Sequence, residues 1–149
     1  MTSGEIRKTL TIDAPPHVVF RALTDERELV QWWPYEAKID PRVGGRFEFK
    51  LRGAARGFDV VFVGRVTELV PGKKLAYTWE SPAQHGEQAR PTSPDVQPST
   101  ITWTLEELPE GKTRVTMLQT GFNERFRQVA EKGWSYNLGR LACLCEGRS

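Results

Sequence analysis

About one third of the way along the chain stands the sequence Arg46-Phe47-Glu48-Phe49-Lys50-Leu51-Arg52. Charged and apolar residues alternate in this stretch without a break, which is the pattern of a β-strand with one face in water and the other face buried. We therefore predict a strand that lies over the core, with Phe47 and Phe49 pointing inward.

Similar strands are predicted from Tyr35 to Thr120, joined by turns rich in Gly and Pro. Their inward-facing residues are Phe58, Val60 and Phe62, then Leu75, Tyr77 and Trp79, then Ile101, Trp103 and Leu105, and finally Val115 and Met117 after a hairpin turn at residues 109–111. The order predicts a meandering antiparallel sheet. Val61 and Val63 fall on the outer face, so part of that face is expected to be covered.

The N-terminal part predicts one strand and two short helices. Residues Ile6–Ile12 alternate as a strand does. The double proline that follows favours the first turn of a helix, because proline lacks the N–H that this turn leaves unpaired. A second short helix begins at a cap, either Thr24 or Asp25, and ends before Pro34.

After Gly121 the apolar residues recur at helical spacing, with charges on the opposite face, so one long helix closes the chain. Its apolar stripe consists of Phe122, Phe126, Val129, Ala130, Gly133, Trp134, Asn137, Leu138, Leu141 and Cys145. Between the strands, Ser81–Ser99 holds four of the ten prolines and predicts a loop, either a tolerated insertion or a lid. The length of 149 residues fits a single domain spanning 1–149.

Composition excludes several classes of protein. The 21 Lys and Arg against 19 Asp and Glu leave a net charge of +2, which does not indicate a nucleic acid or another polyanion as partner. Cys143 and Cys145 are too few and too close for a disulfide framework or a zinc site. Neither a signal peptide nor a membrane-spanning run is found. We predict a soluble cytoplasmic protein without a metal or cofactor.

A series of short motifs resembles, in order and spacing, the SRPBCC (START/Bet v 1-like) superfamily, and within it the branch related to the activator of Hsp90 ATPase. The motifs are Ile12-Asp13-Ala14-Pro15, Val19–Asp25, Trp32-Trp33, Arg42–Phe47, Gly64–Val66, Leu69–Trp79, Gly111–Thr116, and Gly133-Trp134 with Leu138 and Leu141. The resemblance implies an α+β helix-grip fold. In that fold a curved antiparallel sheet of about seven strands wraps around the long C-terminal helix, two short helices follow the first strand, and a cavity opens between sheet and helix.

Aromatic residues make up 10% of the chain and many fall on inward-facing strand positions. A pocket lined by rings with a few polar tips holds small apolar ligands, so we predict a site for a small hydrophobic or aromatic molecule. Its predicted lining is Trp33, Phe47, Phe49, Phe62, Tyr77, Trp79, Trp103, Met117, Trp134 and Leu138. The Tyr77 hydroxyl, the indole N–H groups and Asn137 are candidates to orient the ligand. The alternative is that these rings simply fill the core.

No catalytic motif is present, and we predict no catalytic residue. His17 and His85 belong to no metal-spaced or triad-like pattern, and Glu48 and Asp59 alternate with inward phenylalanines and so face solvent. The two cysteines, two apart on a helix, point in different directions, one inward and one exposed.

Two other functions stay open. One is a protein-interaction module of the co-chaperone type, or a homodimer, that uses Val61 and Val63 as its surface. The other is a cyclase-like or hydrolase-like enzyme that uses polar groups in the cavity.

Overall fold

The computed structural model describes residues 3–34, 36–51, 60–80, 99–123 and 127–147. In chain order its elements are β1 (Ser3–Ile12), α1 (Pro16–Thr24), α2 (Glu26–Leu29), β2 (Glu36–Ile39), β3 (Arg46–Leu51), β4 (Val60–Val70), β5 (Lys74–Glu80), β6 (Ser99–Leu108), a 3₁₀ turn (Pro109–Gly111), β7 (Lys112–Asn123) and α3 (Arg127–Cys145). Several sequence predictions concern residues outside the described ranges, namely Phe58, Asp59, His85, Phe126 and the loop 81–98.

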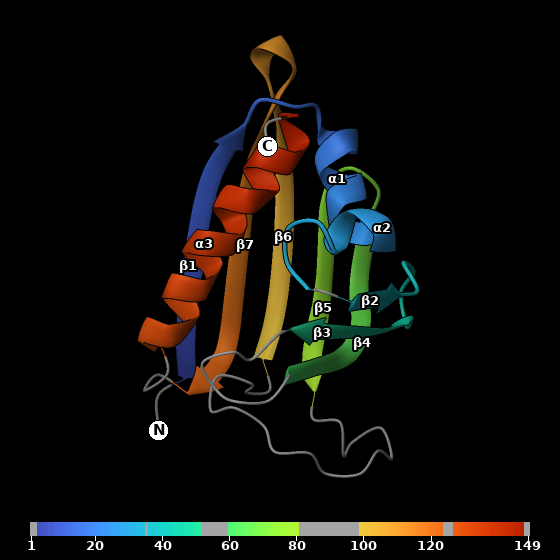
Figure 1. The fold of residues 1–149 in the computed structure, drawn as a ribbon, viewed down its shortest axis with the longest axis vertical. Coiled ribbons are helices and arrows are strands. Elements are labelled where there is room, and N and C mark those ends of the chain that lie inside the picture. Colours follow the sequence, from blue (N-terminus) through green and yellow to red (C-terminus); the bar gives the residue numbers. More distant parts are fainter. Residues whose placement is uncertain (1–2, 35, 52–59, 81–98, 124–126, 148–149) are drawn as a thin grey trace.

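The strands form one antiparallel sheet in the order β1-β7-β6-β5-β4-β3-β2. Successive strands from β2 to β7 are neighbours, as the meander prediction requires, and β1 closes the sheet by pairing with β7. The sheet is curved, and α3 lies along one face of it, with α1 and α2 on the same face beside the C-terminal end of α3 (Figure 1). The predicted α+β helix-grip fold, with its seven strands and two short helices after the first strand, is confirmed.

The two short helices begin as their sequences require. Pro16 is the first residue of α1, where its missing N–H costs nothing. Asp25, not Thr24, caps α2, because its Oδ1 accepts a hydrogen bond of 2.9 Å from the Arg27 backbone N–H. That bond lowers the pKa of the Asp25 carboxyl. The indole of Trp32 donates to the Ala22 carbonyl at 2.8 Å and so ties the end of α2 to α1.

The start of the long helix differs from the prediction. Phe122 and Asn123 belong to β7, where they pair with Gly4 and Ser3 of β1. Backbone pairing with β1 supplies the hydrogen bonds that a helix would otherwise offer these two residues. The prediction that the helical stripe begins at Phe122 was therefore wrong, and α3 begins at Arg127.

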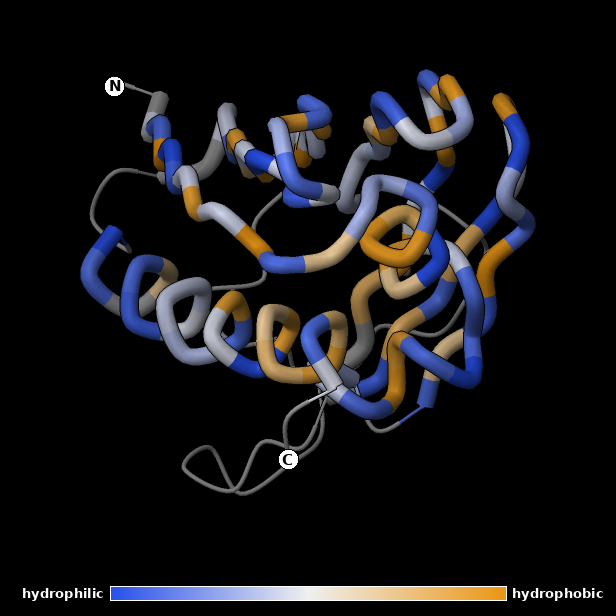
Figure 2. The backbone as a smooth tube through the Cα atoms, turned by 90° about the horizontal axis from the view of Figure 1, so that it is seen from above, coloured by the Kyte–Doolittle hydropathy of each residue, from blue (hydrophilic) through white to orange (hydrophobic). Residues whose placement is uncertain are grey.

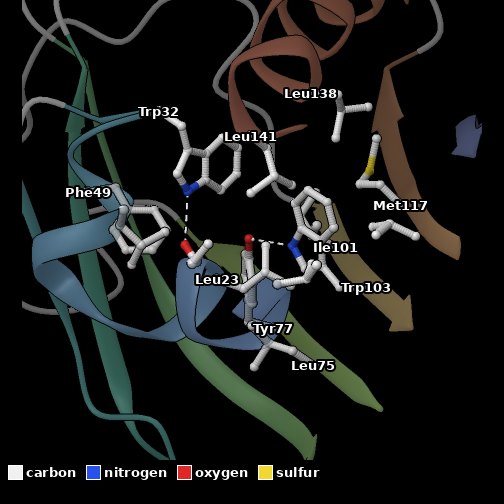
Figure 3. Packing of buried hydrophobic residues seen from close by; sticks show 14 of the residues in the cluster. Leu23, Trp32, Phe49, Leu75, Tyr77, Ile101, Trp103, Met117, Leu138 and Leu141 are labelled. Atoms are coloured by element: carbon white, nitrogen blue, oxygen red, sulfur yellow. Dashed lines mark hydrogen bonds between the residues drawn. The ribbon is translucent and has the colours of Figure 1, made fainter. Parts of the chain in front are cut away.

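The core lies between the sheet and the three helices. Hydrophobic segments of the helices face the sheet across this layer in Figure 2. Figure 3 shows Leu138 and Leu141 of α3 above Met117, Ile101 and Trp103 of the sheet. Val63 is fully buried although it lies on the outer face of β4. It is covered, as expected, so the hypothesis that Val63 forms an exposed partner surface was wrong; the side chain of Val61 is not described.

Candidate ligand-binding site

Five rings meet where β3, β4, β5 and α3 face one another. We call Trp33, Phe49, Phe62, Trp79 and Trp134 the aromatic cage. Trp33 contacts the other four, with its ring centroid 5.3 Å from Phe49, 6.4 Å from Phe62, 5.8 Å from Trp79 and 5.2 Å from Trp134. Trp33 is half-buried and lies in the turn between α2 and β2, whereas the other four rings are buried on helix or strand. The cage therefore has four rings on rigid elements and one on a turn.

The other predicted lining residues lie on the same side of the sheet. Phe47 packs against Tyr77 at 4.8 Å, and Trp103 lies 5.7 Å from Trp134 of the cage. Met117 and Leu138 are buried in the same core cluster. The structure thus brings all ten predicted residues to one layer, and their role in binding stays a prediction.

Polar groups in this layer form a hydrogen-bond chain with a defined direction. The Trp134 indole N–H donates to Gln119 Oε1 at 2.7 Å, and Gln119 Nε2 donates to Ser99 Oγ at 3.1 Å. An indole N–H can only donate, so it sets the orientation of the Gln119 amide and makes Ser99 the acceptor of the second bond. Sequence reasoning missed Ser99 and Gln119, although Gln119 shares the inward-facing alternation of Val115 and Met117 on β7.

Trp79 carries the one buried side-chain nitrogen or oxygen that has no hydrogen-bond partner within the described part of the chain. Its side chain is only 6% exposed. The rings of Phe62 and Trp134 lie nearly parallel to it, at interplanar angles of 24° and 19°. An indole N–H lies in its own ring plane, so it does not point at the face of a parallel ring. An unsatisfied buried donor costs about 1–3 kcal/mol.

Tyr77 is a neutral phenol in this environment. Burial raises the pKa of its hydroxyl, against the smaller opposing effect of the hydrogen bond from Trp103. The Trp103 indole N–H donates to the Tyr77 oxygen at 3.0 Å, as the dashed line in Figure 3 marks. The phenol therefore orients a ring of the core and is no acid or base near neutral pH.

His17 and Glu48, two titratable side chains considered in the sequence analysis, lie away from the cage. His17 is exposed and lines a surface groove of about 560 Å³ with Phe20, Arg21, Thr24, Asp25, Pro71 and Gly72. Glu48 is half-buried on the other face of β3, 3.8 Å from the Arg46 guanidinium. Among the described residues no cluster of three His, Cys, Asp or Glu is placed to hold a metal ion.

The two cysteines are free, and both are half-buried. The prediction that one thiol of the pair is exposed was therefore wrong. Cys145 packs against the core cluster, since the last turn of α3 still faces α1. Burial raises the pKa of the Cys145 thiol to about 12, with smaller contributions from the Glu28 and Glu146 carboxylates.

We expect Cys145 to resist alkylation in the folded protein. A pKa near 12 instead of 9.0 leaves about a thousandfold less thiolate at pH 8. The rate with iodoacetamide should rise about tenfold per pH unit while the protein stays folded. Mass spectrometry of a Cys143→Ser variant, folded and in urea, measures this rate. A folded-state rate at pH 8 equal to the rate in urea would contradict the assignment.

No described helix is long and apolar enough to cross a membrane. No protein among the curated sequences matches the chain. The family model described as activator of Hsp90 ATPase homolog 1-like protein matches residues 13–146.

Solved structures with the same fold come from several bacteria. A protein of Chromobacterium violaceum is 30% identical, with a TM-score of 0.76, and the match covers 95% of this chain and 97% of that one. A protein of Mesorhizobium loti is 26% identical, with a TM-score of 0.76 and coverage of 98% and 99%. The Aha1 dimer of Colwellia psychrerythraea is 21% identical, with a TM-score of 0.75 and coverage of 96% of each chain, and this likeness concerns the fold alone.

Proposed function

Because the chain belongs to the activator of Hsp90 ATPase homolog 1-like family, we propose that it binds a small hydrophobic or aromatic molecule between the sheet and α3. The observation that carries the proposal is the aromatic cage with its unpartnered Trp79 N–H. A buried donor without an acceptor lowers the stability of a core, so its presence in this core calls for an explanation other than stability. A ligand that enters the cage can supply that acceptor.

The polar groups near the cage favour binding over acid–base catalysis. The buried polar side chains of the described residues are Ser99, Thr113 and Gln119, and none of them titrates near neutral pH. Thr113 is already engaged, since its hydroxyl donates to the Ala14 carbonyl at 2.7 Å. These groups suit the orientation of a ligand better than proton transfer.

Apolar area limits the affinity of such a site. Burying about 300 Å² of ligand surface at roughly 25 cal/mol per Å² contributes about 7 kcal/mol, and association itself costs several kcal/mol. We therefore expect dissociation constants in the micromolar range.

Thermal unfolding in the presence of lipids, flavonoids and polyketide-like aromatics tests the proposal. A ligand at about a hundredfold its Kd should raise the free energy of unfolding by about 2.7 kcal/mol, which is about 5–11 °C in Tm for a chain of this size. The control is Tyr136→Ala, which removes a ring that is 68% exposed on α3 and should leave the shift unchanged. Absence of a shift with every compound class would refute the proposal.

A second candidate function is self-association, because a protein of the same fold is a dimer in Colwellia psychrerythraea. Val43, Val70 and Tyr136 are among the large hydrophobic side chains that the structure exposes. Light scattering over a range of concentrations tests this candidate, and a constant monomer mass would remove it. The co-chaperone alternative is tested separately, by whether the pure protein changes the turnover of an Hsp90-type ATPase.

A further inference from the structure

One ring of the aromatic cage, Trp79, lies next to Ser99, the last residue of the hydrogen-bond chain. Trp79 of β5 and Ser99 of β6 are direct partners in the antiparallel register, so their side chains leave the same face of the sheet about 5 Å apart at Cβ. Gly64, the partner of Trp79 on β4, has no side chain. The neighbours of the Trp79 indole across the sheet are therefore a small hydroxyl on one side and, on the other, a glycine against which the Phe47 ring packs.

Both groups of this pair are hydrogen-bond donors without an acceptor. The Trp79 N–H has no hydrogen-bond partner among the residues that the structure describes. Ser99 accepts from Gln119, whose own carbonyl oxygen is taken by Trp134. In both hydrogen bonds the donor lies on the Trp134 side and the acceptor on the Ser99 side. The Ser99 hydroxyl proton is therefore not used in either bond, and no described residue accepts a hydrogen bond from it.

The geometry points to an acceptor on the ligand. We infer that Trp79 and Ser99 form a two-donor anchor that selects a neutral aromatic ketone, or a related aromatic carbonyl compound, over a hydrocarbon of the same shape. One carbonyl oxygen has two lone pairs and can accept from both donors. A carboxylate is disfavoured as far as the described residues go, because neither the cage rings nor Ser99 and Gln119 carry a positive charge that would offset the burial of its charge. This inference rests on the proposed function and names the chemistry of its ligand.

A matched pair of ligands tests the anchor. 1-Tetralone and tetralin differ by one carbonyl oxygen, and we expect 1-tetralone to bind about tenfold more tightly by calorimetry. Trp79→Phe keeps an aromatic ring but removes the N–H, so the preference should fall to about twofold or less. Ser99→Ala removes the second donor with almost no loss of volume, and should reduce the preference even if Trp79→Phe folds poorly.

The control is Trp32→Phe, which makes the same chemical change at an indole outside the predicted lining, whose N–H already has the Ala22 carbonyl oxygen as its acceptor. Its ratio of affinities for the two ligands should equal that of the wild type. A second readout is the ¹H–¹⁵N signal of the Trp79 indole, assigned by its loss in Trp79→Phe. This signal should move downfield when 1-tetralone binds. When tetralin binds, it should move no more than the signals of the other indole N–H groups.

The outcomes separate the two proposals. Equal affinity for both ligands in the wild type would overturn the anchor and leave ligand binding intact. A preference for 1-tetralone that survives in both Trp79→Phe and Ser99→Ala would also overturn it. If neither ligand binds, and the compound classes above give no shift in Tm, the proposed function itself fails.

Discussion

Replacing Trp33 by Ala is expected to lower the free energy of unfolding by about 3 kcal/mol and to create a site for free indole. The Trp33 ring contacts Trp32 and the four other rings of the cage. Removing a ring with so many partners leaves a cavity, and truncation of a buried Trp costs about 3–5 kcal/mol. The lower end applies because Trp33 is only half-buried.

The same variant tests whether the cage accepts a guest. Trp33 is the cage ring that a turn carries, so it occupies space between rings held by the sheet and α3. Indole at about tenfold its Kd should raise the free energy of unfolding of Trp33→Ala by about 1.4 kcal/mol. Thermal unfolding with and without indole measures this effect, with Tyr136→Ala as the control. An equal response to indole in the wild type and in Trp33→Ala would show that the lost ring leaves no site.

Replacing Gly64 by Ala is expected to destabilise the protein by about 3 kcal/mol or more. A Cβ at this position would overlap the Thr78 carbonyl oxygen and lie 2.7 Å from Cε1 of Phe47. The first of these atoms is backbone, so relief requires β4 and β5 to move apart, and it displaces the ring of Phe47. The loss should appear as a decrease of about 6–12 °C in Tm.

Gly139→Ala is the matched control, because a Cβ there meets no atom within 4 Å. Gly139 is exposed in α3, where Ala is favoured over Gly by up to about 1 kcal/mol. The same chemical change should therefore stabilise the protein at residue 139 and destabilise it at residue 64. A Gly64→Ala variant with the Tm of the wild type would show that the two strands separate at little cost.

Local patterns in the sequence determined which segments form strands and turns and which strand residues point into the core. The alternation in β3 and the turn at Pro109–Gly111 depend on neighbours a few residues apart, because side-chain direction along a strand repeats every two residues. The predicted inward positions of β3, β5 and β6, with Phe47, Tyr77 and Trp103 among them, are accordingly buried. The start of α3 could not be predicted this way. Phe122 and Asn123 are in a strand because they pair with β1, which is far away in the sequence.

Only the tertiary structure decided which inward residues meet. The pairing of Trp79 with Ser99 depends on the register between strands, and bulges at Gly4/Glu5 and Val66/Glu68 shift that register locally. The contact of Trp33 with Trp134 joins a turn near the start of the chain to its last helix. Because the donor of Trp79 lacks a partner only in this long-range arrangement, the candidate anchor is a property of the fold that no local pattern encodes.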